Sequence, residues 1–226
     1  MSESDLELKK LHDKLNAHIE EQDKNWKSFV YAKDNGFYQG FAEIGIDGCR
    51  PTEKRFDRYK INDYLSRNFR GLDIGCNCGF FTIFTSRYLK QIIGVEINPY
   101  LIKIADETKD FLNITNSTFL NSSFEDYNTN EKFDVIFSLA NDETIDGNTK
   151  FTFKEYISKI YELLTENGLL MFETVAPDTF EPRLFIPKLE FLKEKFTILE
   201  DRMVKTEYPI NVPERRFLIL KKRIVL

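Results

Sequence analysis

The feature that most constrains the fold of this chain is an alternation of short apolar segments with helical ones, which starts at Gly71 and runs to the C-terminus. The apolar segments typical of strands are Gly71–Ile74, Gln91–Glu96, Thr118–Asn121, Phe133–Leu139, Gly168–Glu173, Phe196–Val204 and Arg216–Arg223. Helical spacing of apolar residues fills Phe80–Leu89, Pro99–Leu112, Thr152–Leu164 and Arg183–Lys195. Strands separated by helices predict an α/β fold, with a parallel sheet covered by helices on both faces.

The last two predicted strands break this alternation. Only the loop Tyr208 to Pro213 separates them, and so short a connection joins antiparallel strands. We therefore expect seven strands that are mostly parallel, with one antiparallel strand in a C-terminal hairpin.

A different pattern precedes the sheet. Asp5–Lys27 is highly charged, with leucines and an isoleucine at helical spacing, which predicts an amphipathic helix. This helix packs on the main domain, forms a homodimer with a second subunit, or closes over an active site as a lid. Phe29–Thr52 is predicted as a glycine-containing loop and Glu53–Asn68 as a helix. We expect a division into an N-terminal helix and covering segment, residues 1–55, and a main domain, residues 56–226.

Composition narrows the class of protein. The net charge is −5 and the pI about 5.3, which disfavours a broad nucleic-acid surface. No apolar stretch approaches the roughly 20 residues of a membrane-spanning helix, and the polar N-terminus lacks a signal-peptide pattern. Three cysteines are too few for a disulfide scaffold. We expect a cytoplasmic protein with no membrane span.

The most informative segment is Leu72–Phe81, where a buried strand ends in a turn containing Gly75 and Gly79 and continues into a helix. Such turns present backbone N–H groups to ligands at the carboxyl ends of strands, and glycine lets a ligand approach the backbone. Glu96, 23 residues after Asp73 (96 − 73), ends the next strand, where a carboxylate can accept both ribose hydroxyl protons. NAD is disfavoured, because a dinucleotide fingerprint has glycine where Asn77 and Phe80 stand.

An acidic residue two positions before the first glycine resembles motif I of class I S-adenosylmethionine-dependent methyltransferases. The resemblance covers about Gly71 to Arg223 and implies their Rossmann-like fold and S-adenosyl-L-methionine as cofactor. It implies these cofactor contacts: Asp73, Gly75, Asn77, Phe80, Phe81, Glu96, Ile97, Ser122, Ser123, Phe124 and Leu139. Ser122 departs from the family, which often has Asp there, so the adenine amino group needs a backbone carbonyl, Glu125 or Asp126 as acceptor.

The segment before the domain resembles methyltransferases of bacterial surface-polysaccharide pathways, in which Tyr-Gln and Gly-x-Arg-x-Thr segments cover the cofactor. This resemblance implies cofactor contacts from Tyr38, Gln39 and Arg50, and a guanidinium fork suits the cofactor's carboxylate. The alternative is a set of surface arginines at a helix start.

The loop from Ser138 to Asn148 follows the fourth strand of the domain and faces the transferable methyl group. Relatives often carry His after the Asn, but here that position is Asp142. Asp142 and Glu143 are the candidate bases for a hydroxyl acceptor, and Asn141, Asp146 and Asn148 orient substrate. Three alternatives stay open: a solvated acidic loop, a divalent ion, or an anionic acceptor that needs no base and is positioned by Arg183, Arg215 and Arg216.

These observations predict a methyltransferase that modifies an oxygen of a small molecule or of a carbohydrate or phosphate group, in capsule or lipopolysaccharide biosynthesis. The alternatives are an RNA or protein methyltransferase and a non-enzymatic cofactor-sensing module. No metal site is predicted, because Cys49, Cys76 and Cys78 lack a fourth ligand for structural zinc.

Overall fold

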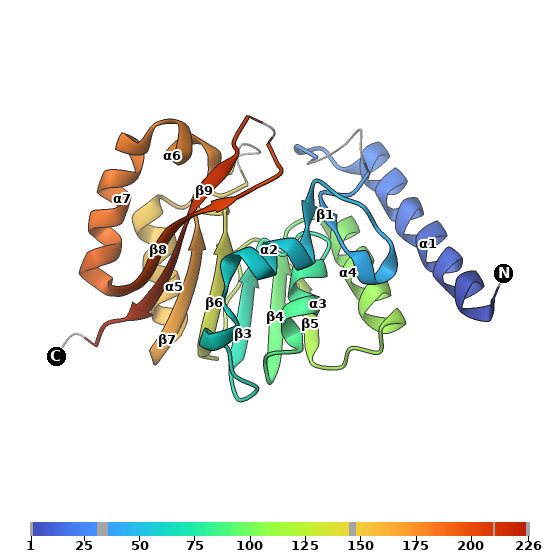
Figure 1. The fold of residues 1–226 in the computed structure, drawn as a ribbon, viewed down its shortest axis with the longest axis horizontal. Coiled ribbons are helices and arrows are strands. Elements are labelled where there is room, and N and C mark those ends of the chain that lie inside the picture. The colour runs from blue at the N-terminus through green and yellow to red at the C-terminus, as the bar shows by residue number, and fades with distance from the viewer. Residues whose placement is uncertain (1, 31–35, 145–147, 210, 225–226) are drawn as a thin grey trace.

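The computed structural model describes residues 2–30, 36–144, 148–209 and 211–224. At its centre is a sheet with the strand order β5-β4-β3-β6-β7-β9-β8 (Figure 1). The strands are β3 (Arg70–Ile74), β4 (Gln91–Glu96), β5 (Ser117–Asn121), β6 (Phe133–Leu139), β7 (Leu164–Glu173), β8 (Phe196–Lys205) and β9 (Glu214–Lys222). Within the described residues, β9 alone runs antiparallel to its neighbours β7 and β8. The predicted seven-stranded sheet with one antiparallel strand in a C-terminal hairpin is confirmed.

Two layers of helices enclose the sheet. On one face, α2 (Thr52–Tyr59), α3 (Phe80–Ser86) and α4 (Pro99–Phe111) pack through residues such as Phe56, Phe81 and Ile104. On the other face, α5 (Phe153–Leu163) and α7 (Pro182–Lys195) pack through residues such as Ile157 and Leu192. Burying apolar stripes on both faces is what holds an open α/β sheet together, and it leaves the strand ends free to build a site.

The predicted elements and the observed ones differ in several places. The helix expected over Glu53–Asn68 ends at Tyr59, because Lys60 adopts a left-handed conformation with φ 45° and the chain turns to bury Ile61. A 3₁₀ turn, Asn62–Tyr64, follows. A short helix that was not predicted, α6 (Ala176–Phe180), lies between β7 and α7, and β7 itself begins four residues earlier than expected, at Leu164.

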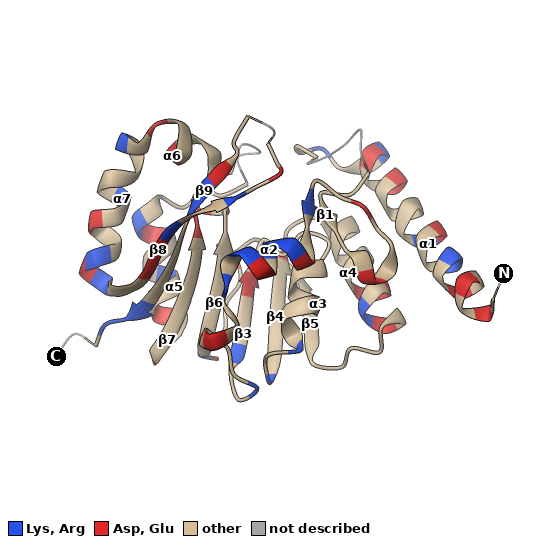
Figure 2. Ribbon diagram, viewed as in Figure 1, with Lys and Arg blue, Asp and Glu red and all other residues tan. Residues whose placement is uncertain are grey.

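The N-terminal helix α1 (Glu3–Asn25) packs against α4 (Figure 1). Its apolar stripe, Leu11, Leu15 and Ile19, is buried within the chain's own core. Lys14 and Glu107 form an ion pair of 2.7 Å across the interface. Acidic and basic residues are interleaved along the rest of the helix (Figure 2). The expected packing of this helix on the main domain is confirmed.

The segment predicted as a loop carries regular structure. We call residues 36–51 the cover segment. It contains β1 (Gln39–Gly40), a 3₁₀ turn (Ala42–Ile44) and β2 (Arg50–Pro51), and the two strands pair in parallel. Phe41 and Ile44 of this segment are fully buried in the core, so the segment packs on the domain.

None of the described helices is both long enough and apolar enough to cross a membrane.

Candidate active site

A cavity of about 230 Å³ opens at the carboxyl ends of the parallel strands. Its walls come from the turn after β3, the end of β4, the loops after β5, β6 and β7, the helix α1, the cover segment and the β8–β9 hairpin. Predicted site residues that line it are Tyr38, Gln39, Asp73, Gly75, Asn77, Phe81, Glu96, Ile97, Ser122, Ser123, Phe124, Leu139, Asn141 and Glu143. Three predicted residues, Arg50, Phe80 and Asp142, lie behind this surface and are buried.

Glu96 is held at the cavity by backbone donors. The N–H of Asn77 donates to its Oε2 at 3.1 Å and the N–H of Asn98 to its Oε1 at 2.9 Å. A carboxylate is a hydrogen-bond acceptor through both oxygens, so Glu96 is suited to a ligand that carries hydroxyl donors. Beside it, Asn77 Oδ1 is buried and has no hydrogen-bond partner among the described residues. Leaving a buried acceptor without a hydrogen bond is costly. A ligand that donates hydrogen bonds, such as a ribose with its hydroxyls, fits these acceptor oxygens.

The two glycines of the turn serve packing. Gly75 and Gly79 have φ values of 64° and 71°, in the left-handed region that favours glycine. A Cβ on Gly79 would lie 2.6 Å from Ala105 and from the ring of Phe119, and one on Gly75 would lie 2.8 Å from the Asn141 side chain. The missing side chain of Gly79 thus makes room for α4 and β5, and that of Gly75 for the loop after β6. Gly75 also lines the cavity, and the approach of a ligand to it stays a prediction.

Gln39 ties the cover segment to the turn. Its Nε2 donates to the Cys76 carbonyl at 3.1 Å, and its Oε1 accepts from the Phe80 N–H at 3.0 Å. The second bond satisfies one of the N–H groups that the first turn of α3 leaves open. Phe80 itself points away from the cavity and packs with Phe37 and Phe41 of the cover segment, while Phe81 lines the cavity.

Asp73 lies in the cavity wall beneath the turn. Thr82 Oγ1 donates to its Oδ2 at 2.6 Å. Burial raises the pKa of Asp73 to about 7, against the opposing effects of Thr82 and Arg55. A cation bound next to this carboxyl would favour its ionised form.

Arg50 and Glu173 form a buried ion pair behind the cavity. Arg50 Nη2 lies 2.6 Å from Glu173 Oε1, and both side chains are at most 1% exposed. Tyr59 donates to Glu173 Oε2 at 2.9 Å, and Arg55 Nη2 lies 3.9 Å from the same oxygen. Burial opposes ionisation of Glu173, but Arg50, Arg215 and Arg55 outweigh it and lower the pKa to about 2. Arg50 thus has a protein carboxylate as partner, and Arg55 and Arg215 are the arginines that line the cavity.

The two candidate bases in the acidic loop after β6 lie in different environments. Asp142 is buried and pairs with Lys188 of α7 at 2.8 Å, and the same ammonium lies 3.0 Å from Asp178 of α6. Burial raises the pKa of Asp142 to about 6. Glu143 lines the cavity and is mostly exposed. Asn141 also lines it and donates to the Ile74 carbonyl.

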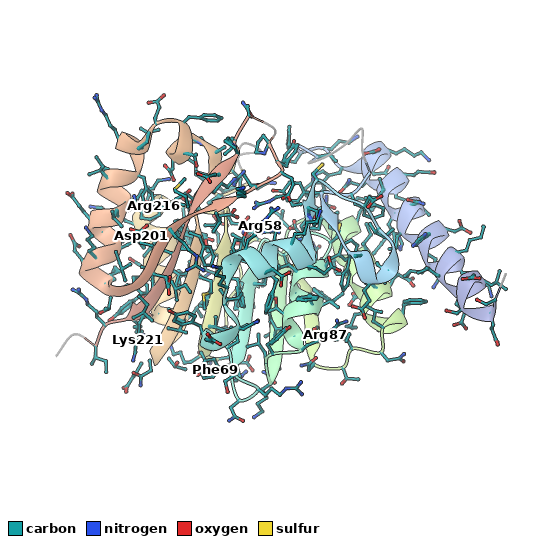
Figure 3. All side chains as sticks on the ribbon, viewed as in Figure 1. Arg58, Phe69, Arg87, Asp201, Arg216 and Lys221 are labelled. Atoms are coloured by element: carbon teal, nitrogen blue, oxygen red, sulfur yellow. The ribbon has the colours of Figure 1, made fainter. Side chains whose placement is uncertain are left out.

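Other predicted positions in and near this loop are placed as follows. Asn148 lines the cavity, and Asp146 lies outside the described residues. Of the arginines suggested for an anionic acceptor, Arg183 is exposed. Arg216 makes a bidentate pair with Asp201 on the neighbouring strand (Figure 3). Only Arg215 of the three lines the cavity among the described residues.

The loop after β5, for which an adenine contact is predicted, lines the cavity. Its two carboxylates, Glu125 and Asp126, already accept hydrogen bonds from other residues. Glu125 Oε1 accepts the N–H groups of Lys150 and Phe151, and Asp126 Oδ2 accepts the Ser123 hydroxyl. Ser122 Oγ donates to the Ser123 carbonyl and keeps lone pairs for an amino group.

Several site residues were not predicted. Ile19 and Gln22 of α1 and Trp26 directly after it line the cavity, and Gln22 accepts a 2.7 Å hydrogen bond from Asn98. No pattern in the sequence shows which residues of an amphipathic helix reach a site on another element. Glu173 carried a usable signal, since it ends a predicted strand just as Glu96 does. Among the described residues, no three His, Cys, Asp or Glu side chains are grouped so as to hold a metal ion.

A family model described as a methyltransferase domain matches residues 65–208, more than half of the chain. The chain belongs to this methyltransferase domain family. Membership confirms the predicted enzyme class, and it supports the predicted cofactor. The match covers every strand of the sheet up to β8 and the turn that carries Asp73 and Gly75.

Curated relatives of this methyltransferase differ in what they modify. A putative protein N5-glutamine methyltransferase of Methanocaldococcus jannaschii is 36% identical over 106 residues, which are 41% of this chain and 53% of the relative. A malonyl-[acyl-carrier protein] O-methyltransferase of Ilyobacter polytropus is 28% identical over 167 residues, covering 69% of this chain and 58% of the relative. The methyltransferase therefore spans between half and three-fifths of the length of these two relatives.

A solved structure has the same fold. It is the N-methyltransferase NodS from Bradyrhizobium japonicum in complex with S-adenosyl-L-homocysteine, with a TM-score of 0.60 and 16% identity, covering 92% of this chain and 98% of that one. The predicted Rossmann-like methyltransferase fold is confirmed.

Proposed function

We propose that this methyltransferase transfers the methyl group of S-adenosylmethionine to an oxygen of a small molecule, or of a carbohydrate or phosphate group. The observation that carries the proposal is Glu96 at the cavity, fixed by two backbone N–H groups and next to the unpartnered Asn77 Oδ1. Glu96 would hold the ribose hydroxyls, Asp73 the amino end, and Ser122 to Phe124 the adenine. When bound, the cofactor supplies an electrophilic methyl group on a sulfonium.

Enclosure of the cavity supports a small acceptor. The cover segment and the β8–β9 hairpin approach one another over the cavity, where the rings of Tyr38 and Tyr208 meet edge to face with centroids 5.7 Å apart. Walls on several sides exclude water and orient two reactants, and orientation alone contributes roughly 7–11 kcal/mol to well-aligned reactions. A folded RNA would need the rings to separate. A sugar intermediate of capsule or lipopolysaccharide biosynthesis is our preferred acceptor, by likeness of the cover segment to surface-polysaccharide methyltransferases.

Glu143 is the better placed of the two candidate bases. It lines the cavity and is mostly exposed, with Lys188 Nζ 3.4 Å from its Oε2, whereas Asp142 is buried and lies 2.8 Å from the same ammonium. Its carboxylate would accept the proton of a hydroxyl acceptor, and Asn141 would orient that hydroxyl. Asp142 would act by fixing the loop to α7.

Turnover and cofactor affinity separate these roles. In Glu143→Gln, turnover should fall by about 10²–10⁴-fold with cofactor affinity nearly unchanged, since a general base acts in the transition state. Asp142→Asn should lower thermal stability more than Glu143→Gln does, because it removes one of the two buried carboxylates that pair with Lys188. Formation of S-adenosylhomocysteine is measured with nucleotide sugars, RNA and carrier-protein thioesters as acceptors. If RNA were the one acceptor class that supports turnover, the small-acceptor proposal would be overturned. If Glu143→Gln turned over at the wild-type rate, Glu143 would not be the base.

A further inference from the structure

The wall of the cavity between α2 and β9 contains more positive than negative charge. Arg50, Arg55 and Arg215 surround Glu173, and each arginine is at most 5% exposed. Three positive charges and one negative charge leave an excess of two (3 − 1). Asp73 also interacts with Arg55, and its ionised form reduces the excess to one. In either state the wall is cationic and shielded from water, so an anion in the cavity would be strongly favoured.

The two arginines that line the cavity lie at different places in it. Arg55 stands 5.2 Å over the ring of Phe81 and donates to Tyr59 Oη, close to Asp73 and the turn after β3. Arg215 comes from β9, beyond β6 and β7 in the sheet order. Under the proposed function the cofactor extends from Glu96 on β4 to the turn after β3, so Arg55 faces its carboxylate end. The space in front of Arg215 is left to the acceptor.

Arg215 has hydrogen-bonding capacity that the protein does not use. Its Nη1 donates to the Thr174 carbonyl at 3.3 Å, and its Nε has no partner among the described residues. Val175, Ala176 and Pro177, which follow Thr174 in the chain, line the cavity and carry no carboxylate. A planar fork binds carboxylate or phosphate oxygens in pairs.

We infer that the methyl acceptor carries an anionic group, a carboxylate or a phosphate, and that Arg215 binds it. This inference rests on the proposed function, because it assigns that end of the cavity to the acceptor. The Thr174 carbonyl accepts a hydrogen bond from Arg215 Nη1, the charge of Glu173 attracts the same guanidinium, and Glu143 lines the same cavity from the loop after β6. The anion fixes one end of the acceptor while another of its atoms receives the methyl group.

The test uses inorganic phosphate and acetate as probes, on full-length protein saturated with S-adenosylhomocysteine so that the cofactor's carboxylate site is filled. Calorimetric titration at constant ionic strength, balanced with chloride, should show one of the two anions binding. Preference for acetate would indicate a carboxylate acceptor, and preference for phosphate a phosphorylated one. Arg215→Gln should weaken that binding by roughly 10- to 150-fold, the range for a charge-assisted hydrogen bond. Arg67→Gln, which changes an exposed arginine, should leave it unchanged.

The outcomes distinguish a failure of the proposed function from a failure of the anionic-acceptor inference. If the wild type fails to bind S-adenosylhomocysteine, the proposed function falls. If it binds S-adenosylhomocysteine but neither anion, or if Arg215→Gln binds the anion as the wild type does, the anionic acceptor is overturned while the function stands. Should Arg215→Gln fail to fold, Arg215→Lys keeps the charge without the fork, and it should bind the anion more weakly than the wild type. Equal binding by the lysine variant would overturn the inference.

Discussion

Glu96 is the residue whose substitution tests cofactor binding most directly. Two backbone N–H groups fix its carboxylate at the cavity, so no rearrangement is needed before a ribose binds. We expect Glu96→Ala to weaken S-adenosylmethionine binding by about 1.5–3 kcal/mol, or roughly 10–150-fold. Calorimetry measures the affinity, and Glu194→Ala, on the exposed surface of α7, is the control. Wild-type affinity in a folded Glu96→Ala protein would remove the ribose assignment.

Asp73 should make cofactor binding depend on pH. Burial raises its pKa to about 7, so the carboxyl of the free protein is largely protonated below that pH. The amino end of the cofactor is cationic and favours the ionised form. Binding below pH 7 must therefore release a proton, and affinity should rise with pH by up to about tenfold per unit until it levels off above 7.

Titrations of the wild type and of Asp73→Asn between about pH 5.5 and 8 check this expectation. The variant has no carboxyl to ionise, and its affinity should change far less over the range. Parallel curves for the two proteins would assign the pH dependence to another group.

Residues at strand ends were predictable and residues joined by distant contacts were not. Asp73 and Glu96 lie at or next to the carboxyl ends of strands, which periodicity located to within a residue. Arg50 was expected to face the cofactor, yet its partner Glu173 lies 123 positions away. The sequence contains both residues but gives no sign of that pairing, because it depends on how the cover segment folds back over β7.

At the scale of elements, α1 forms part of the cavity wall. Its length and its apolar stripe could be predicted from the sequence. Gln22 and Trp26 lie outside that stripe, so the pattern gives no sign that they reach the cavity. The cover segment was predicted as loop, because strands of two residues have no periodicity to detect. Its aromatic residues, Phe37 and Phe41, were the signal that it packs on the domain.

Truncation tests the role of α1. Deleting residues 1–28 removes three lining side chains and should weaken S-adenosylmethionine binding by roughly tenfold or more, the equivalent of about 1.4 kcal/mol. Deleting residues 1–7 is the matched control, since it leaves Leu11, Leu15 and Ile19 in the core. Deleting residues 1–55 also removes Gln39 and Arg50 and should be more severe than either. Equal affinity of the 1–28 truncation and the control would show that α1 is dispensable for the cavity.

At the scale of the whole molecule, Glu173 connects elements that are far apart in the sequence. It ends β7, where Arg50 of β2 pairs with it and Tyr59 of α2 donates to it. The charge of Arg215 on β9 also lowers its pKa. The strands themselves are held by apolar burial on both faces, which any residues of suitable size supply. The Glu173 cluster instead fixes the cover segment and the hairpin relative to the sheet, and so sets the walls of the cavity.

Glu173→Gln should therefore destabilise the protein, and the effect should depend on pH. Removing one partner of a buried ion pair costs about 3–5 kcal/mol, here because three arginines would face an uncharged amide. The pKa of Glu173 falls from an ordinary value of 4.5 to about 2 in the folded protein. The stabilisation from its charge is thus fully present above pH 4.5 and is lost as the pH falls toward 2. Urea unfolding at about pH 7, 5 and 3 measures the difference in free energy of unfolding between wild type and variant, with the exposed substitution Glu162→Gln as control. A difference that stayed constant down to pH 3 would mean that the amide disturbs packing and that the charge of Glu173 contributes nothing to the cavity walls.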